Sequence, residues 1–141
     1  AISGCGPVSM AICVSSLTGT LVNPLDMCDW CYEKGVWIPG EGGLHSLPPT
    51  VCAEFGLSCE LTDGSNPQTL INALSSGKLI VTLVGPGHFT TSGHFLVLRD
   101  VTSTGKILVA DCGNSANNNV EWDMSIILDE GRPLFWIIGE Q

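Results

Sequence analysis

The sequence has few positive charges and no long apolar run. Only five Lys and Arg oppose fourteen Asp and Glu, which gives the 141-residue chain a formal net charge of −9. Nucleic acids and anionic membranes attract basic proteins, so a chain this acidic is a poor partner for either. Gly and Pro interrupt every apolar stretch before it reaches the ~18 residues that a membrane-spanning helix needs. We therefore expect no nucleic-acid partner and no membrane span.

The remaining composition is typical of one folded domain. Hydrophobic residues make up 44% of the chain, enough to form a core rather than a disordered segment. The seven cysteines are an odd number, so at least one is unpaired unless it bonds another molecule. One free nucleophile with up to three disulfides fits this count, and so does a reduced protein with several buried thiols.

The order of the expected elements predicts an α+β fold, with helices first and an antiparallel sheet after them. Apolar periodicity, Asn-Pro caps and glycine stops predict helices, whereas β-branched apolar runs predict strands. The glycine-rich segment 37–43 is expected to be a surface loop. The expected helices are 7–18, 25–34, a late-starting one within 45–55, 68–75 and 124–128; the expected strands are 57–62, 78–84, 94–101, 106–111 and 133–138.

Cys5 is the candidate nucleophile. It lies between Gly4 and Gly6, just before Pro7 and a helix-compatible apolar pattern. A thiol at a helix N-terminus is stabilised as the thiolate by the helix dipole, and the small neighbours leave room for a substrate carbonyl. The alternative is a structural cysteine buried beside an ordinary helix start.

A predicted hairpin supplies a base and a partner for it. Strands 94–101 and 106–111 are joined across 102–105, and antiparallel pairing about this turn sets His94 opposite positions 111–115. Asp111 and Asn114 are the polar side chains there that could accept a ring N–H. A cysteine, a histidine and an Asp or Asn match the nucleophile, the base and the group that orients the base.

Two other groups compete with this assignment. His88 lies in a Gly/Pro/Thr/Ser loop, where we expect it near the cleft, in contact with substrate rather than as the base. Cys28 and Cys31 form a C-x-x-C motif, which can be a redox pair or half of a zinc site. No second motif completes a zinc set, so we favour a structural role. Cys52 and Cys59 either bridge or pack.

Three segments resemble the papain-like cysteine peptidases of the double-glycine leader-peptidase group, family thirty-nine of the cysteine peptidases. The similarity lies in Ser3–Ala11, with its Cys-Gly-Pro sequence, in Gly87–Leu98, with its Ser-Gly-His-Phe sequence, and in Lys106–Asp111. Segments 122–128 and 133–136 also resemble the free-standing bacterial members, so the resemblance extends over essentially the whole chain.

The resemblance implies a single papain-like domain over residues 1–141, cutting a peptide or protein substrate without metal or organic cofactor. It makes Cys5 the nucleophile, His94 the base and Asp111 the residue that orients the base. Glycine-rich segments 40–43 and 85–93 would border the cleft. The residues expected to contact substrate or line the cleft are Gly4, Gly6, His88, Gly93 and Asn114. We expect a secreted or cell-surface bacterial protein, with the cytoplasm as the alternative.

Two departures from the family pattern stand out. The family has a glutamine a few residues before the nucleophile that donates to the oxyanion, but the glutamines here are Gln68 and Gln141. Either the natural protein is longer and its upstream residues supply a donor, which we favour, or a side chain from another segment does so. We expect the domain to be a monomer or part of a longer chain. Cys112 stands where the family tends to have proline, and we expect it to change only local packing or redox behaviour. Amidase or acyltransferase chemistry on the same scaffold, or a non-catalytic or redox module using Cys28 and Cys31, are the alternative functions.

Overall fold

The computed structural model describes residues 5–141 and confirms the α+β fold. Most elements form where the sequence predicts them, and no end differs from its predicted position by more than three residues. The helices are α1 (Cys5–Thr18), α2 (Pro24–Glu33), α3 (Leu47–Phe55), α4 (Pro67–Ser75), the 3-10 helix η1 (Ser115–Asn119) and α5 (Met124–Gly131). The strands are β1 (Trp37–Ile38), β2 (Gly42–Gly43), β3 (Leu57–Thr62), β4 (Leu79–Val84), β5 (His94–Val101), β6 (Ile107–Ala110) and β7 (Phe135–Glu140).

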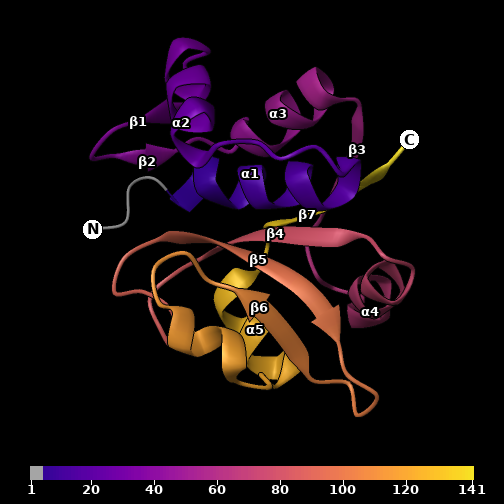
Figure 1. Ribbon diagram of the computed structural model, residues 1–141. Coiled ribbons are helices and arrows are strands. Elements are labelled where there is room, and N and C mark those ends of the chain that lie inside the picture. The colour runs from indigo at the N-terminus through magenta and orange to yellow at the C-terminus, as the bar shows by residue number, and fades with distance from the viewer. Residues whose placement is uncertain (1–4) are drawn as a thin grey trace.

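Five strands form one antiparallel sheet in the order β3-β7-β4-β5-β6. The helices of the first half, α1 to α3, lie on one face of this sheet, and α4 and α5 lie on the other (Figure 1). Each face has its own apolar core, because side chains alternate along a strand. Val81, Val97 and Trp136 pack in the core with α1, whereas Leu98 and Ile137 pack in the core with α4 and α5.

The helix starts follow the sequence signals. Asn23 caps α2 by accepting a hydrogen bond from the backbone N–H of Leu25 at 2.8 Å, and Pro24 occupies the first helical position. Gly56 ends α3 with a φ of 72°, a left-handed conformation that favours glycine. No helix within residues 5–141 is long and apolar enough to cross a bilayer.

The structure differs from the predicted elements in two places. The segment expected as a loop, 37–43, forms a hairpin of two short strands, β1 and β2, each two residues long, in which Trp37 pairs with Gly43. The 3-10 helix η1 was not expected at all. These elements are only two to five residues long, which is too short to show a periodic apolar pattern in the sequence.

The hairpin β5-β6 has the predicted register. Val97 pairs with Ala110 and Leu98 with Val109, and an irregularity shifts the pairing by one residue nearer the turn. This register carries His94, at the start of β5, to the same end of the sheet as the segment after Ala110. Residues 94 and 111 are therefore brought together by local strand pairing alone.

Candidate active site

Cys5 is the first residue of α1, where the sequence analysis predicts it. Its side chain is buried, and the helix start lies close against two apolar side chains. A Cβ on Gly6 would come within 2.9 Å of Leu47 Cδ1 and 3.2 Å of Phe95 Cδ2, so only glycine fits there without displacement. Gly4, the other small neighbour named from the sequence, lies outside the described residues.

His94 and Asp111 form a buried pair. The ring nitrogen Nε2 of His94 lies 2.7 Å from Oδ1 of Asp111, and the two side chains are 3% and 0% exposed. The hydrogen bond places the proton on Nε2 when the ring is neutral and leaves Nδ1 as the acceptor. Of the two candidate partners for His94, the structure selects Asp111.

Three hydrogen bonds hold the Asp111 side chain in place. Its Oδ1 accepts from the backbone N–H of Gly113 at 2.9 Å as well as from His94, and its Oδ2 accepts from Nδ2 of Asn117 at 2.9 Å. Burial opposes ionisation of Asp111, but the hydrogen bonds from Asn117, His94 and Gly113 outweigh it and lower the carboxyl pKa below its usual value. Asp111 is therefore an anion across the neutral range.

Asn114 has a different place from the one predicted. Its side chain accepts a hydrogen bond from the backbone N–H of Ala116 at 3.1 Å and so caps η1 rather than contacting His94. The amide that joins the His94–Asp111 pair is Asn117, which the sequence analysis missed. In the sequence, the three consecutive asparagines 117–119 are the indication of a further amide near Asp111. The turn of η1 is what directs the Asn117 side chain back to Asp111.

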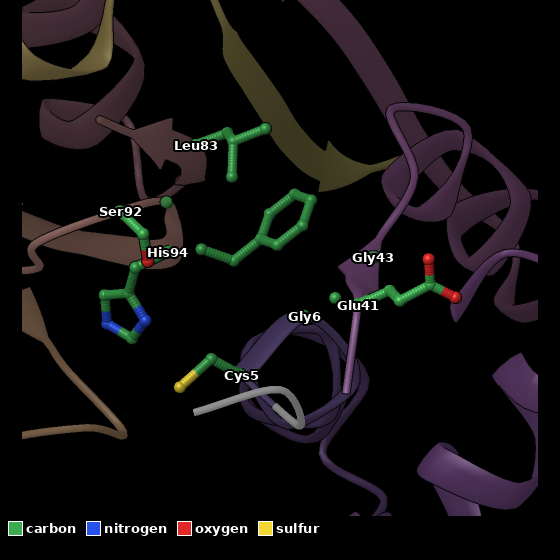
Figure 2. A pocket seen from close by; sticks show the side chains of 10 residues that line it. Cys5, Gly6, Glu41, Gly43, Leu83, Ser92 and His94 are labelled. Carbon is green, nitrogen blue, oxygen red and sulfur yellow. The ribbon is translucent and has the colours of Figure 1, made fainter. Parts of the chain in front are cut away.

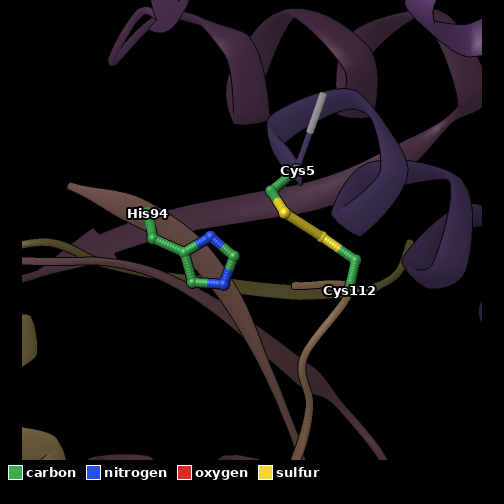
Figure 3. Close-up of side chains that lie close together, drawn as sticks. All are labelled: Cys5, His94 and Cys112. Atoms are coloured by element: carbon green, nitrogen blue, oxygen red, sulfur yellow. A yellow bond between two sulfur atoms is a disulfide. The ribbon is translucent and has the colours of Figure 1, made fainter. Parts of the chain in front are cut away.

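Cys5 is not a free thiol in this structure. Its sulfur forms a disulfide with Cys112, which follows Asp111 directly, and the two Cα atoms are 6.0 Å apart. The His94 ring lies beside this disulfide (Figure 3). Cys112 is therefore bonded directly to the candidate nucleophile, which is a form of the altered redox behaviour expected at this position. The other five cysteines, Cys13, Cys28, Cys31, Cys52 and Cys59, are free.

A cavity of about 340 Å³ opens beside Cys5 and His94. Figure 2 shows both side chains directed to one end of it, with Glu41 at the opposite side. The remaining lining comes from Gly6, Gly42, Gly43, Leu83, Ser92, Gly93 and Phe95. Of the segments expected to border the cleft, residues 41–43 and 92–93 line the cavity. The predicted cleft residues Gly6 and Gly93 are both among its lining residues.

His88 does not line this cavity. Its ring Nδ1 and its backbone N–H both contact the Glu130 carboxylate, and its ring meets Trp122 edge-on with centroids 5.7 Å apart. His88 is therefore not part of the cavity wall, and its contact with a substrate stays a prediction. The carboxylate of Glu130, in α5, binds His88 on the face of the sheet that carries α4 and α5. The local Gly-His-Phe sequence does not reveal this contact, because Glu130 lies 42 residues later in the chain.

Cys28 and Cys31 lie in α2, away from this site. Cys31 is fully buried, and burial followed by the proximity of Cys28 raises the pKa of its thiol to about 12. Burial followed by the nearby Asp29 also raises the pKa of Cys28. A reactive redox cysteine needs a lowered pKa, so these two thiols have the environment of structural residues.

Comparison with known proteins gives a consistent assignment. A family model described as Peptidase_C39 like family matches residues 1–136. The peptidase domain of Streptococcus ComA, a bifunctional ABC transporter in a quorum-sensing pathway, superposes with a TM-score of 0.72 at 15% identity, covering 100% of this chain and 94% of that one. A C39-like peptidase from Bacillus anthracis gives 0.64 at 14% identity, covering 99% and 90%. No curated protein matches the chain in sequence. The fold is that of the papain-like C39 peptidase domains.

Proposed function

The chain belongs to the peptidase C39-like family, and from this premise we propose that it is a cysteine hydrolase that cuts a peptide bond with Cys5, His94 and Asp111. The observation that carries the proposal is the convergence of these three residues. The first residue of α1, the first residue of β5 and the residue after β6 meet beside one cavity. Each has the chemistry of its role: nucleophile, base and the group that orients the base.

The proposed reaction begins with a proton transfer from the Cys5 thiol to Nδ1 of His94. The thiolate attacks the substrate carbonyl carbon, and the C–N bond breaks as the imidazolium returns its proton to the leaving amine. Water, deprotonated by the same imidazole, then hydrolyses the thioester. Asp111 keeps the ring in one tautomer and stabilises its positive charge while the proton is held there.

The start of α1 is suited to the negative charge that develops in this reaction. The first N–H groups of a helix have no carbonyl partner inside that helix, and its dipole is positive at this end. We propose that the backbone N–H of Cys5 donates to the oxyanion. Gly6 and Gly43 both line the cavity, and a Cβ on either would come within 2.9 Å or 2.8 Å of Leu47 Cδ1, so the wall beside Cys5 packs closely only with glycine at both positions.

The Cys5–Cys112 disulfide must be reduced before this reaction can start, because the thiolate is the nucleophile and a disulfide sulfur cannot form one. A dithiol reductant supplies two electrons and two protons, giving two protein thiols and an oxidised dithiol. We further propose a secreted or cell-surface location, where the oxidised form of such a pair persists. The Cys5–Cys112 disulfide then makes hydrolysis dependent on reduction.

The experiment is cleavage of a mixed-sequence peptide library, followed by mass spectrometry of the new termini. The dithiol-treated wild type should generate termini, and Cys5→Ala under the same conditions should generate none. Products carrying an added amine or thiol in place of water would instead identify acyl transfer on the same scaffold. Termini produced equally by both proteins would contradict the proposal.

A further inference from the structure

The residues around the disulfide also have the composition of a metal site. The sulfurs of Cys5 and Cys112 and a ring nitrogen of His94 all lie within 4.8 Å of one another. They come from three separate parts of the fold, so the backbone holds the group together from several directions (Figure 3). Within residues 5–141, no other set of three His, Cys, Asp or Glu side chains converges in this way.

The imidazole of His94 is already oriented as metal-binding histidines are. Such a ring usually donates its second N–H to a carboxylate, which fixes the tautomer and raises the basicity of the ligating nitrogen. Here the 2.7 Å bond from Nε2 to Asp111 does this, and Asn117 and Gly113 fix the carboxylate in turn. The lone pair of Nδ1 is then available to a ligand.

We propose that the reduced protein binds one zinc ion through Cys5, Cys112 and His94. Two thiolates and a neutral imidazole are soft and borderline ligands that favour zinc over magnesium or calcium. Three protein ligands with a fourth position for water is a known zinc arrangement. The two thiolate charges neutralise the ion, which removes the cost of holding a divalent cation beside a buried helix start.

The backbone geometry is compatible with both the disulfide and the metal. Tetrahedral zinc with Zn–S bonds of about 2.3 Å sets its two sulfurs about 3.8 Å apart. With Cα atoms 6.0 Å apart, rotation of the two cysteine side chains after reduction reaches this separation without a shift of the backbone at Cys5 or Cys112. Cys112 is exposed while Cys5 and His94 are buried, so the ion reaches the group from the Cys112 side.

Zinc binding and hydrolysis exclude each other. Reduction gives two thiols, and zinc then displaces both thiol protons as two Zn–S bonds form. The same sulfur that would attack a carbonyl is coordinated, and the nitrogen that would take its proton is coordinated as well. The site therefore has three states: disulfide, free dithiol and zinc dithiolate. Only the free dithiol is competent for attack.

The test uses Co²⁺ as a spectroscopic substitute and Zn²⁺ as a competitor on the full chain, after dithiol reduction and removal of the reductant without air. We expect one Co²⁺ per chain, with the thiolate-to-metal charge-transfer absorption of two sulfur ligands, and its loss on addition of one equivalent of Zn²⁺. The oxidised protein should show no such absorption. These readouts do not require the protein to be a peptidase, so failure of the proposed function leaves them intact.

Variants assign the ligands. Cys112→Ser and His94→Ala should each lose the two-sulfur, one-imidazole spectrum, while the double variant Cys28→Ser with Cys31→Ser should retain it. Circular dichroism should show that each variant keeps the wild-type fold. The inference is overturned if the reduced wild type binds no stoichiometric metal, or if the spectrum survives Cys112→Ser but disappears in the Cys28/Cys31 variant.

Discussion

Nε2 of His94 lies 2.7 Å from Oδ1 of Asp111, and the hydrogen bond between them is shielded from solvent. The pair joins the first residue of β5 to the segment after β6. Because Asp111 is ionised, it fixes the imidazole with its proton on Nε2 and its free lone pair on Nδ1. The two proposals made above both depend on this orientation of the ring: in one Nδ1 is the base for Cys5, and in the other it is a zinc ligand.

His94→Gln should lower kcat/KM for peptide cleavage by about 10²–10⁴-fold, the usual contribution of a general base. Steady-state kinetics on any peptide that the reduced wild type cuts provides the measurement. His88→Gln is the matched control and should keep wild-type kinetics, because its ring contacts Glu130 and Trp122 rather than the cavity. If His88→Gln loses activity and His94→Gln retains it, the base has been assigned to the wrong histidine.

Asn117→Ala should destabilise the protein most at neutral pH. Loss of its hydrogen bond raises the pKa of Asp111 toward the ordinary value. A carboxyl with a lowered pKa in the folded state adds stability above its unfolded pKa, and this is lost as pH falls through the folded value. The difference in unfolding free energy between wild type and variant should therefore shrink below about pH 4.

Asn114→Ala is the comparison for that experiment. Its side chain caps η1, so its removal should cost about 0.5–2 kcal/mol at every pH. Urea denaturation of both variants from neutral to acid pH separates the two roles. A cost for Asn117→Ala that does not change with pH would mean that its bond does not stabilise the Asp111 anion.

Alkylation should distinguish the cysteines. Before reduction, iodoacetamide should label neither Cys5 nor Cys112, and after mild reduction both should react. Cys13 and Cys31 should stay unlabelled in the folded protein, because burial, the larger cause, and a neighbouring cysteine raise the pKa of each to about 12. Peptide mapping by mass spectrometry identifies which cysteines are alkylated, before and after reduction. Preferential labelling of Cys28 and Cys31 would favour the redox-module alternative.

Cys112→Ser should cleave the peptide library without added reductant, whereas the wild type should need a dithiol. The substitution removes the sulfur that bonds Cys5 and leaves the His94–Asp111 pair in place. New termini are counted for both proteins with and without dithiol. A Cys112→Ser protein that still requires the reductant would show that the disulfide is not what restrains Cys5.

Local signals account for most of what the sequence predicts correctly. Asn23 and Pro24 begin α2, Gly56 ends α3, and the register of β5 and β6 brings His94 to Asp111. These features depend on capping, backbone conformation and strand pairing between neighbours in the chain, all of which short segments encode.

The features that the sequence did not reveal depend on contacts between distant segments. The Cys5–Cys112 disulfide joins residues 107 positions apart, and cysteine pairing does not follow from spacing. His88 is held at Glu130, 42 residues later in the chain, by hydrogen bonds to the carboxylate of that residue. Asn117 reaches Asp111 only because η1 turns the chain back, and its composition carries no periodic signal.

The central claim is that the Cys5 thiol performs peptide hydrolysis. Its most direct test is a parallel digestion of the peptide library by dithiol-reduced wild type and dithiol-reduced Cys5→Ala, with new termini counted by mass spectrometry. Cys5→Ala removes one sulfur atom from the start of α1 and should retain the fold, as checked by circular dichroism. The account predicts new termini from the wild type and none above background from Cys5→Ala. Equal numbers of termini from the two proteins would contradict it.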